Sequence, residues 1–150
     1  MLEEYHKKRD FKKTSEPKGE VKPSERGRIY VIQRHDATHL HYDLRLEDEG
    51  VLKSWAIPKE PPAVHGVKRL AVQTEDHPLN YASFEGVIPE GEYGAGRVEI
   101  WDCGTFDLLE KTSDKYIINI KGKRLNGPYA LIRFKRSGDP KNCLFFKKKE

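Results

Sequence analysis

Short runs of alternating hydrophobic and polar residues dominate this chain. Segments rich in β-branched and aromatic residues recur from residue 26 onward: RGRIYVIQR, THLHYDLRLE, VLKSWAI, KRLAVQT, GRVEIWD, DKYIINIK, GPYALIRF and NCLFFKK. Turn signals built from Gly, Pro, Asn and Asp, such as DEG and SGD, separate these segments. Because such composition and period-two alternation are typical of strands, the pattern predicts about eight β-strands.

Helical periodicity is weak by comparison. Only LEEYHKK and FDLLEK show it, and each is at most about two helical turns long. The pattern therefore favours a mainly β fold, a small closed or nearly closed β-barrel with one or two short flanking helices, over a doubly wound α/β sheet.

The chain divides into two regions of different composition. Residues 1–27 lack a strand pattern and contain SEPKGEVKPSERG, so we expect a flexible basic N-terminal arm. Residues 28–150 carry the strand segments and are long enough to hold a core, so we expect one β-barrel domain there.

Positive charge is concentrated at the two ends. Residues 1–28 carry nine Lys and Arg against six Asp and Glu, and residues 133–150 carry seven against two. The two ends therefore carry net charges of +3 and +5. The middle of the chain carries −4, which gives the whole chain its net charge of +4. Basic ends suit loose contact with a polyanion such as nucleic acid, although solvated tails give the same pattern.

Cysteine usage and hydropathy point to the cytoplasm. Cys103 and Cys143 are far apart and form no CxxC pair, which predicts reduced thiols. We see no apolar export signal at the start and no run of about 18 apolar residues. We expect a soluble cytoplasmic protein without a membrane partner.

The stretch QRHDATHLHYDLRLE, residues 33–47, carries the densest candidate chemistry. In a strand, alternate side chains share a face, so the two faces separate into an apolar set, Leu40, Tyr42, Leu44 and Leu46, and a polar set, His39, His41, Asp43, Arg45 and Glu47. Imidazole, carboxylate and guanidinium on one face suit a divalent metal ion beside an anionic substrate. A solvated strand face is the alternative.

A second polar stretch, TEDHPLNYASFEGVIPEGEYGAG, follows an apolar strand segment. Glu75, His77 and Tyr81 lie where loop residues can reach a site, although His77 before Pro78 also suits a turn. The glycines of this stretch fit no GxxxxGK[ST] phosphate loop and indicate turns instead.

Together these motifs resemble a known family. His35, His41-Tyr42-Asp43 and Arg45, followed by LKSWAIPK, KRLAVQTEDHPLNYASFEG and IPEGEYGAGRVEIWD, closely resemble the 3′-phosphoesterase module of bacterial DNA ligase D proteins and of small stand-alone archaeal and bacterial proteins. KRDFKKTSEP near the start resembles the amino-terminal signature of the same family. The likeness covers nearly the whole chain.

The resemblance implies a fold and a reaction. The family fold is a small β-barrel with short helices. The family is expected to act at DNA or RNA–DNA primer-template 3′ ends, removing a terminal ribonucleotide and then the remaining 3′-phosphate to leave a 3′-OH. No KxDG ligase signature occurs, so sealing is expected to need a separate DNA ligase.

The resemblance also assigns roles to individual residues. It places a manganese ion on His35, His41 and Asp43, and the phosphate on Arg45, His77 and Tyr81. Further positions associated with activity are Lys59, Arg69 and Glu75 in the barrel domain and Arg9, Asp10 and Glu16 in the arm.

The metal ligands can be chosen in two ways. Strand alternation alone selects His39, His41 and Asp43, whereas the family pattern selects His35 in place of His39. We favour His35, because three alternate side chains on one strand span roughly 13 Å, too far to share one ion. His39 is then expected at the rim of the site, with Asp36 in a turn.

Two other functions fit parts of the sequence. A non-catalytic nucleic-acid-binding barrel would use the basic ends, with Tyr42, Trp55 and Tyr81 as stacking surfaces. A mononuclear iron oxygenase would use His41 and Asp43 with a distant third ligand, for which His77 is the candidate.

Overall fold

Nine strands and three short helical segments make up the structure, a computed structural model that describes residues 1–19 and 28–150. The helical segments are α1 (Glu3–Lys7) and two 3-10 turns, η1 (Leu79–Ser83) and η2 (Lys135–Ser137). The strands are β1 (Ile29–Asp36), β2 (Leu40–Asp48), β3 (Val51–Ile57), β4 (Lys68–His77), β5 (Gly86–Ile88), β6 (Gly96–Thr112), β7 (Lys115–Lys121), β8 (Asn126–Arg133) and β9 (Asn142–Lys147).

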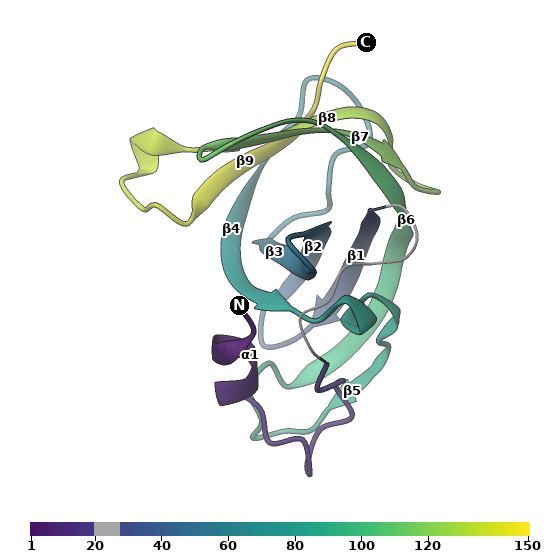
Figure 1. Cartoon of the computed structure of the whole chain (residues 1–150), viewed down its shortest axis with the longest axis vertical. Coiled ribbons are helices and arrows are strands. Elements are labelled where there is room, and N and C mark those ends of the chain that lie inside the picture. The colour runs from purple at the N-terminus through teal and green to yellow at the C-terminus, as the bar shows by residue number, and fades with distance from the viewer. Residues whose placement is uncertain (20–27) are drawn as a thin grey trace.

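The strands form one antiparallel sheet that closes into a barrel (Figure 1). The order is β1-β2-β3-β4-β9-β8-β7-β6, and β6 pairs back onto β1, so eight strands close the barrel. The short strand β5 is the ninth strand and pairs with the first residues of β6, residues 96–98. Closure leaves few free sheet edges, which protects an all-β chain from edge-to-edge association.

Two apolar clusters lie on opposite sides of the barrel wall. The inner cluster fills the barrel and includes Tyr30, Leu44 and Phe145, all fully buried. The outer cluster lies between the wall and the segments around α1, η1 and β5, and includes Tyr5 and Tyr81. The outer cluster is what fixes these short segments to the barrel.

Most of the expected fold is confirmed. The structure is mainly β with a closed barrel, and LEEYHKK contains α1 as predicted. FDLLEK, the second brief candidate for a helix, is not helical, because this stretch belongs to β6 and pairs with β7 from Thr105 to Thr112. Ladder hydrogen bonds along that hairpin outweigh a weak local helical pattern.

The first 19 residues differ from the expected flexible arm. They include α1, they bury Leu2, Tyr5, Thr14 and Glu16, and α1 packs on β4 (Figure 1). Composition alone gives no sign of this packing, because a few apolar and ionic contacts are enough to dock a polar segment. The predicted end of the arm at residue 27 lies outside the described residues.

No helix in the described ranges, 1–19 and 28–150, is both long and apolar enough to span a membrane.

Candidate functional site

The β1–β2 hairpin brings two histidines and an aspartate together on the outer face of the barrel. His35 on β1 is the direct cross-strand partner of His41 on β2, and their rings lie 4.7 Å apart. Asp43 follows two residues after His41, so its side chain leaves the same face. The side chains of Tyr42 and Leu44 point inward to the core, as the alternation predicted.

The three polar side chains meet at one carboxylate oxygen. Asp43 Oδ2 lies 3.2 Å from His41 Nε2 and 3.6 Å from His35 Nδ1. One potential ligand atom from each residue falls within 4.8 Å of the others, a grouping found only here among the residues that the structure describes. His39 is exposed and contributes its backbone carbonyl, which accepts a hydrogen bond from His41 Nδ1 at 3.0 Å.

Backbone carbonyls orient both imidazole rings. Since a carbonyl oxygen can only accept, His35 Nε2 donates to Gly94 O at 2.7 Å and His41 Nδ1 donates to His39 O. The other nitrogen of each ring faces Asp43, where a proton is donated to the carboxylate and a lone pair can instead bind a metal ion. Metal-binding histidines in proteins are held in this way, with the distal N–H donated to a carbonyl or carboxylate.

The charges around Asp43 favour its ionised form. Burial opposes ionisation, but hydrogen bonds from His35 and His41 and the positive charge of Arg45 together hold the pKa of Asp43 well below its ordinary value. Burial lowers the pKa of His41, but the contact with Asp43 outweighs it and raises that pKa overall. The negative charge of Asp43 that stabilises a proton on His41 can equally stabilise a bound cation.

A donor set of two imidazole nitrogens and one carboxylate oxygen fits a divalent transition metal ion. Two ligands of one such ion lie about 3 Å apart when each bond is about 2.1 Å, close to the separations of 3.2 and 3.6 Å here. His35, His41 and Asp43 are therefore the residues that could hold a metal.

Arg45 presents its guanidinium group beside this donor set. Its Nε donates to Gln33 Oε1 at 2.7 Å, and its Nη2 lies 3.6 Å from Asp43 Oδ2. The guanidinium carbon lies 4.9 Å from the centre of the Tyr81 ring. Gln33 is fully buried and also donates to the carbonyls of Tyr81 and Phe84, so it fixes both the arginine and the η1 segment.

His77 lies between two arginines. Its Nδ1 is 3.2 Å from Arg45 Nη1, and its Nε2 is 3.4 Å from Arg9 Nη2. Burial, followed by the charges of Arg45 and Arg9, lowers the pKa of His77 well below its ordinary value. His77 is therefore neutral near pH 7, and it belongs to the arginine side of the site and not to the metal-binding group.

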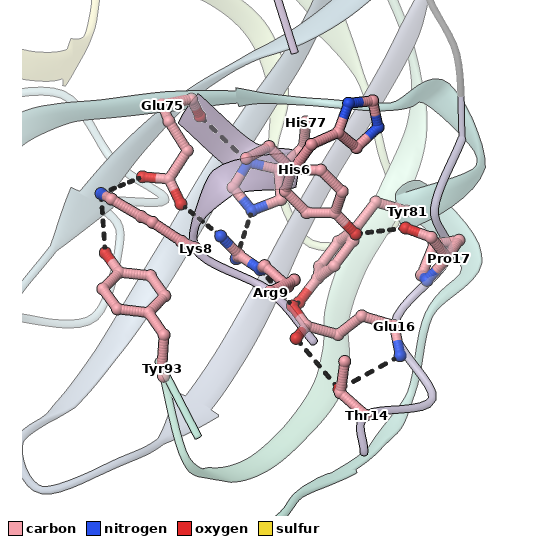
Figure 2. Close-up of polar contacts among 12 residues, drawn as sticks. His6, Lys8, Arg9, Thr14, Glu16, Pro17, Glu75, His77, Tyr81 and Tyr93 are labelled. Carbon is pink, nitrogen blue, oxygen red and sulfur yellow. Dashed lines mark hydrogen bonds and ion pairs between the residues drawn. The ribbon is translucent and has the colours of Figure 1, made fainter. Parts of the chain in front are cut away.

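The N-terminal segment closes the site from outside (Figure 2). Arg9 makes ion pairs with Glu75 at 2.9 Å and with Glu16 at 3.2 Å, and all three side chains are buried. Glu16 also accepts a hydrogen bond from the Tyr81 hydroxyl at 2.8 Å. Three predicted functional residues from distant parts of the sequence, Arg9, Glu16 and Glu75, thus form one network around Tyr81.

These groups line a cavity of about 310 Å³. Its lining includes the candidate metal ligands together with Arg9, Arg45, Glu75, His77, Tyr81, Tyr93 and Gly94. Tyr93 is half exposed at the edge, where Lys8 Nζ contacts its hydroxyl at 3.4 Å (Figure 2). The cavity is thus acidic at the metal-binding group and basic at Arg45, a combination suited to an anion beside a cation.

Glu16 reaches this cavity only through Arg9 and Tyr81, and three further predicted functional residues lie outside it. Lys59 is exposed after β3, and Arg69 donates to the carbonyl of Glu60 elsewhere on the barrel. Asp10 is exposed and accepts a hydrogen bond from the backbone N–H of Lys12, a local turn contact. Their assigned roles stay predictions.

Sequence reasoning missed three contributors to the cavity. Gln33 shares a strand face with His35, so strand alternation could have revealed it. Gly94, treated as a turn glycine, supplies the carbonyl for His35 and has a φ of 74°, which favours glycine. Tyr93 gave no sequence signal that distinguishes it from other loop aromatics.

Comparison with known proteins gives a consistent result. A family model described as the DNA Ligase D 3′-phosphoesterase domain matches residues 33–133. A Mycobacterium tuberculosis protein named multifunctional non-homologous end joining DNA repair protein LigD is 52% identical over 137 residues, covering 88% of this chain and 18% of the relative. A Pseudomonas aeruginosa protein named multifunctional non-homologous end joining protein LigD is 46% identical over 156 residues, covering 99% of this chain and 19% of the relative.

The chain thus spans about a fifth of the length of these relatives. The matched region includes the candidate metal ligands, Arg45, Glu75, His77 and Tyr81.

Proposed function

The chain belongs to the DNA ligase D 3′-phosphoesterase domain family, and from this premise we propose that it is a manganese-dependent 3′-phosphoesterase that heals DNA ends. As a phosphodiesterase it removes the 3′-terminal ribonucleotide as its nucleoside and leaves that phosphate on the strand, and as a phosphomonoesterase it then removes the 3′-phosphate. The product is a 3′-OH end that a DNA ligase can seal in non-homologous end joining.

One juxtaposition supports this proposal most strongly. A group suited to a divalent cation, His35, His41 and Asp43, shares one cavity with the Arg45 guanidinium. Among the residues that the structure describes, the Arg45 nitrogens other than Nε contact only His77 and, at 3.6 Å, Asp43. A phosphate group needs such a combination, because its negative charge must be offset before a nucleophile can approach.

A metal ion held by His35, His41 and Asp43 would supply Lewis-acid stabilisation of the phosphate. Arg45 binds the same phosphate through its Nη groups, and Gln33 holds the guanidinium plane by accepting from Nε. His77, kept neutral by burial and two arginines, donates its Nδ1–H to the carbonyl of Glu75 at 3.0 Å and accepts from Arg9 at Nε2. It therefore orients the arginines on the phosphate side and is not the proton donor to the leaving group. Tyr81 packs its ring against Arg45 and His77 and fixes both.

The N-terminal segment completes the substrate pocket. Glu16 and Glu75 hold Arg9 against His77, so the segment adds a second guanidinium to the phosphate side. Tyr93 and Lys8 at the edge are placed to contact the terminal nucleotide. Both end-trimming steps then use one pocket, since each breaks an ester of the same phosphate.

The test is a direct assay of end healing. Labelled primer-templates ending in a 3′ ribonucleotide or in a 3′-phosphate are incubated with the protein and manganese. A parallel reaction contains a chelator. We expect conversion of both ends to 3′-OH with manganese and none with the chelator. Persistence of both ends at saturating manganese would overturn the proposal.

The two other functions are less well supported. The oxygenase reading used His77 as the third ligand, but His77 lies against Arg45 and Arg9 instead. A binding barrel without chemistry gives no reason for a grouped donor set beside a buried arginine. A binding barrel would heal neither end in the assay above and would bind nucleic acid equally well after Asp43→Ala or chelation.

A further inference from the structure

A second basic surface lies at one open end of the barrel, on the inner side of the β1–β2 hairpin. Its lining surrounds a depression of about 460 Å³ and contains an indole ring and two guanidinium groups. We name it the Trp101 mouth, and its main residues are Glu60, Val64, Val67, Arg69, Trp101 and Arg124.

The two arginines of the Trp101 mouth differ from several cations elsewhere on the barrel. Many barrel cations pair with a carboxylate, for example Arg133 with Asp114 and Lys121 with Asp107. Within residues 1–19 and 28–150, no carboxylate lies in ion-pair range of Arg69 or Arg124. Glu60 on the same lining offers its backbone carbonyl to Arg69 Nε, which leaves both terminal nitrogens of Arg69 available.

The Trp101 mouth is held rigidly. The Asp102 carboxylate accepts backbone hydrogen bonds from residues 123, 124 and 125 at 2.9–3.0 Å, and a fourth from the Tyr30 hydroxyl. This anchors the β7–β8 turn so that the guanidinium group of Arg124 lies 4.6 Å from the centre of the Trp101 ring. A preorganised arginine stacked on an indole loses little conformational freedom when it binds a partner.

The mouth and the candidate site share the same end of one hairpin. His35 and His41 leave the outer face of the β1–β2 hairpin, whereas their neighbours Arg34 and Tyr42 leave the inner face. Tyr42 contacts Trp101 edge to face at 5.6 Å. A chain that runs from the cavity over the β1–β2 turn therefore reaches the Trp101 mouth directly.

We propose that the Trp101 mouth binds the nucleic-acid strand whose 3′ end occupies the cavity, with Arg69 and Arg124 on backbone phosphates and Trp101 beside a base. This rests on the proposed function and extends it, since it assigns a strand-binding surface separate from the chemical site. Unpaired guanidinium groups beside an aromatic ring are the combination that single-strand-binding surfaces use.

The test compares a long and a short substrate. A primer-template with a 3′-phosphate can reach both surfaces, whereas a 3′-phosphorylated dinucleotide can reach only the cavity. For Arg124→Ala we expect KM for the primer-template to rise about tenfold with kcat unchanged, and the dinucleotide to be hydrolysed as by the parent. The slope of log affinity against log salt should fall by about one.

Arg136→Ala is the matched control. Arg136 is also exposed and also lacks a carboxylate in ion-pair range among the described residues, but it lies in η2 near the opposite end of β8. We expect its primer-template KM to stay within twofold of the parent. Trp101→Leu keeps an apolar side chain against the core and provides a second test, with its folding checked by circular dichroism.

Three results would overturn the inference. Equal effects of Arg124→Ala and Arg136→Ala would show a general charge effect, and equal loss on both substrates would show damage to the cavity. Unchanged primer-template affinity in Arg124→Ala and Trp101→Leu would show that nucleic acid does not bind the mouth. If the parent hydrolyses neither substrate, the proposed reaction fails, whereas primer-template affinities measured by fluorescence anisotropy still decide the inference.

Discussion

Backbone carbonyls decide which ring nitrogens of the two histidines are available at the candidate metal site. Gly94 O holds Nε2 of His35 and His39 O holds Nδ1 of His41, so the remaining nitrogens face Asp43. The backbone of His39 therefore supports the site although its side chain is exposed. A side-chain substitution at His39 keeps that carbonyl. Substitution of His35, His41 or Asp43 removes a potential metal ligand.

Four single substitutions test this division. We expect His35→Ala, His41→Ala and Asp43→Ala to reduce manganese-dependent release of 3′-phosphate at least about a hundredfold, the scale of removing a principal catalytic group. His39→Ala should stay within about tenfold of the parent. Initial rates at saturating manganese give the measurement, with circular dichroism to confirm folding. An inactive His39→Ala with an active His35→Ala would show that the ligand set is wrong.

The N-terminal segment is the element whose role differs most from expectation. Tyr5 is fully buried, packs 4.9 Å from His77 and donates its hydroxyl to the carbonyl of Pro17. Burying a side chain of this size stabilises the packed state by about 2 kcal/mol. Together with the buried ion pairs of Arg9, this contact helps to hold the segment against the barrel.

Deletion of residues 1–19 should leave a folded barrel with a damaged site. The inner core contains no residue from this segment, so the far-ultraviolet circular dichroism spectrum should keep its β character. Removal of Arg9 and Glu16 frees His77 and Tyr81, and we expect activity on ribonucleotide-ended strands to fall at least about tenfold. Full activity of the shortened protein would show that the segment only covers the site.

Acid should release the same segment before the barrel unfolds. Burial raises the pKa of Glu75, but its ion pairs with Arg9 and Lys8 outweigh burial and lower that pKa below the ordinary 4.5. Its stabilising contribution is therefore complete above the ordinary pKa and is lost as the pH falls through the lowered value.

Hydrogen exchange measures this release. We expect amides of residues 5–9 to lose protection as the pH falls through the lowered pKa of Glu75, while those of β1 and β2 keep it. In Glu75→Gln the protection of residues 5–9 should already be reduced at neutral pH and should depend less on pH. Uniform loss of protection across the chain would show that the segment and the barrel unfold together.

Over the whole molecule, the fold does not depend on the candidate metal ligands. The inner cluster closes the barrel, and His35, His41 and Asp43 lie on the outer face of its wall. Their side chains make no contribution to the inner core. The barrel therefore acts as a rigid support on which the site is built.

Metal removal should consequently abolish activity without unfolding the protein. We expect chelated protein to keep its circular dichroism spectrum. Manganese at a hundredfold excess over its Kd should stabilise the fold by about 2.7 kcal/mol, which raises Tm by roughly 5–10 °C. Differential scanning calorimetry gives the measurement, and Asp43→Ala is the control that should lose the shift. Unfolding on chelation would contradict this separation of fold and site.

The sequence by itself determined the elements that local pattern controls. Period-two alternation was enough to predict a mainly β barrel and to place Tyr42 and Leu44 inward with His41 and Asp43 outward. The weak helical pattern of FDLLEK was misleading, because this stretch pairs as part of β6 with β7, and that pairing depends on residues outside the stretch. Family resemblance selected His35 over His39, and the roughly 13 Å span of three alternate side chains on one strand supported that choice.

Only the tertiary structure decided which distant residues meet. Cross-strand register places His35 against His41, and docking of residues 1–19 brings Arg9 and Glu16 to His77 and Tyr81. A sequence reports which side chains are available, but contacts between distant residues depend on the closed path of the backbone. For the same physical reason the role of the Gly94 carbonyl was invisible in the sequence, since every residue carries one and only the fold directs it.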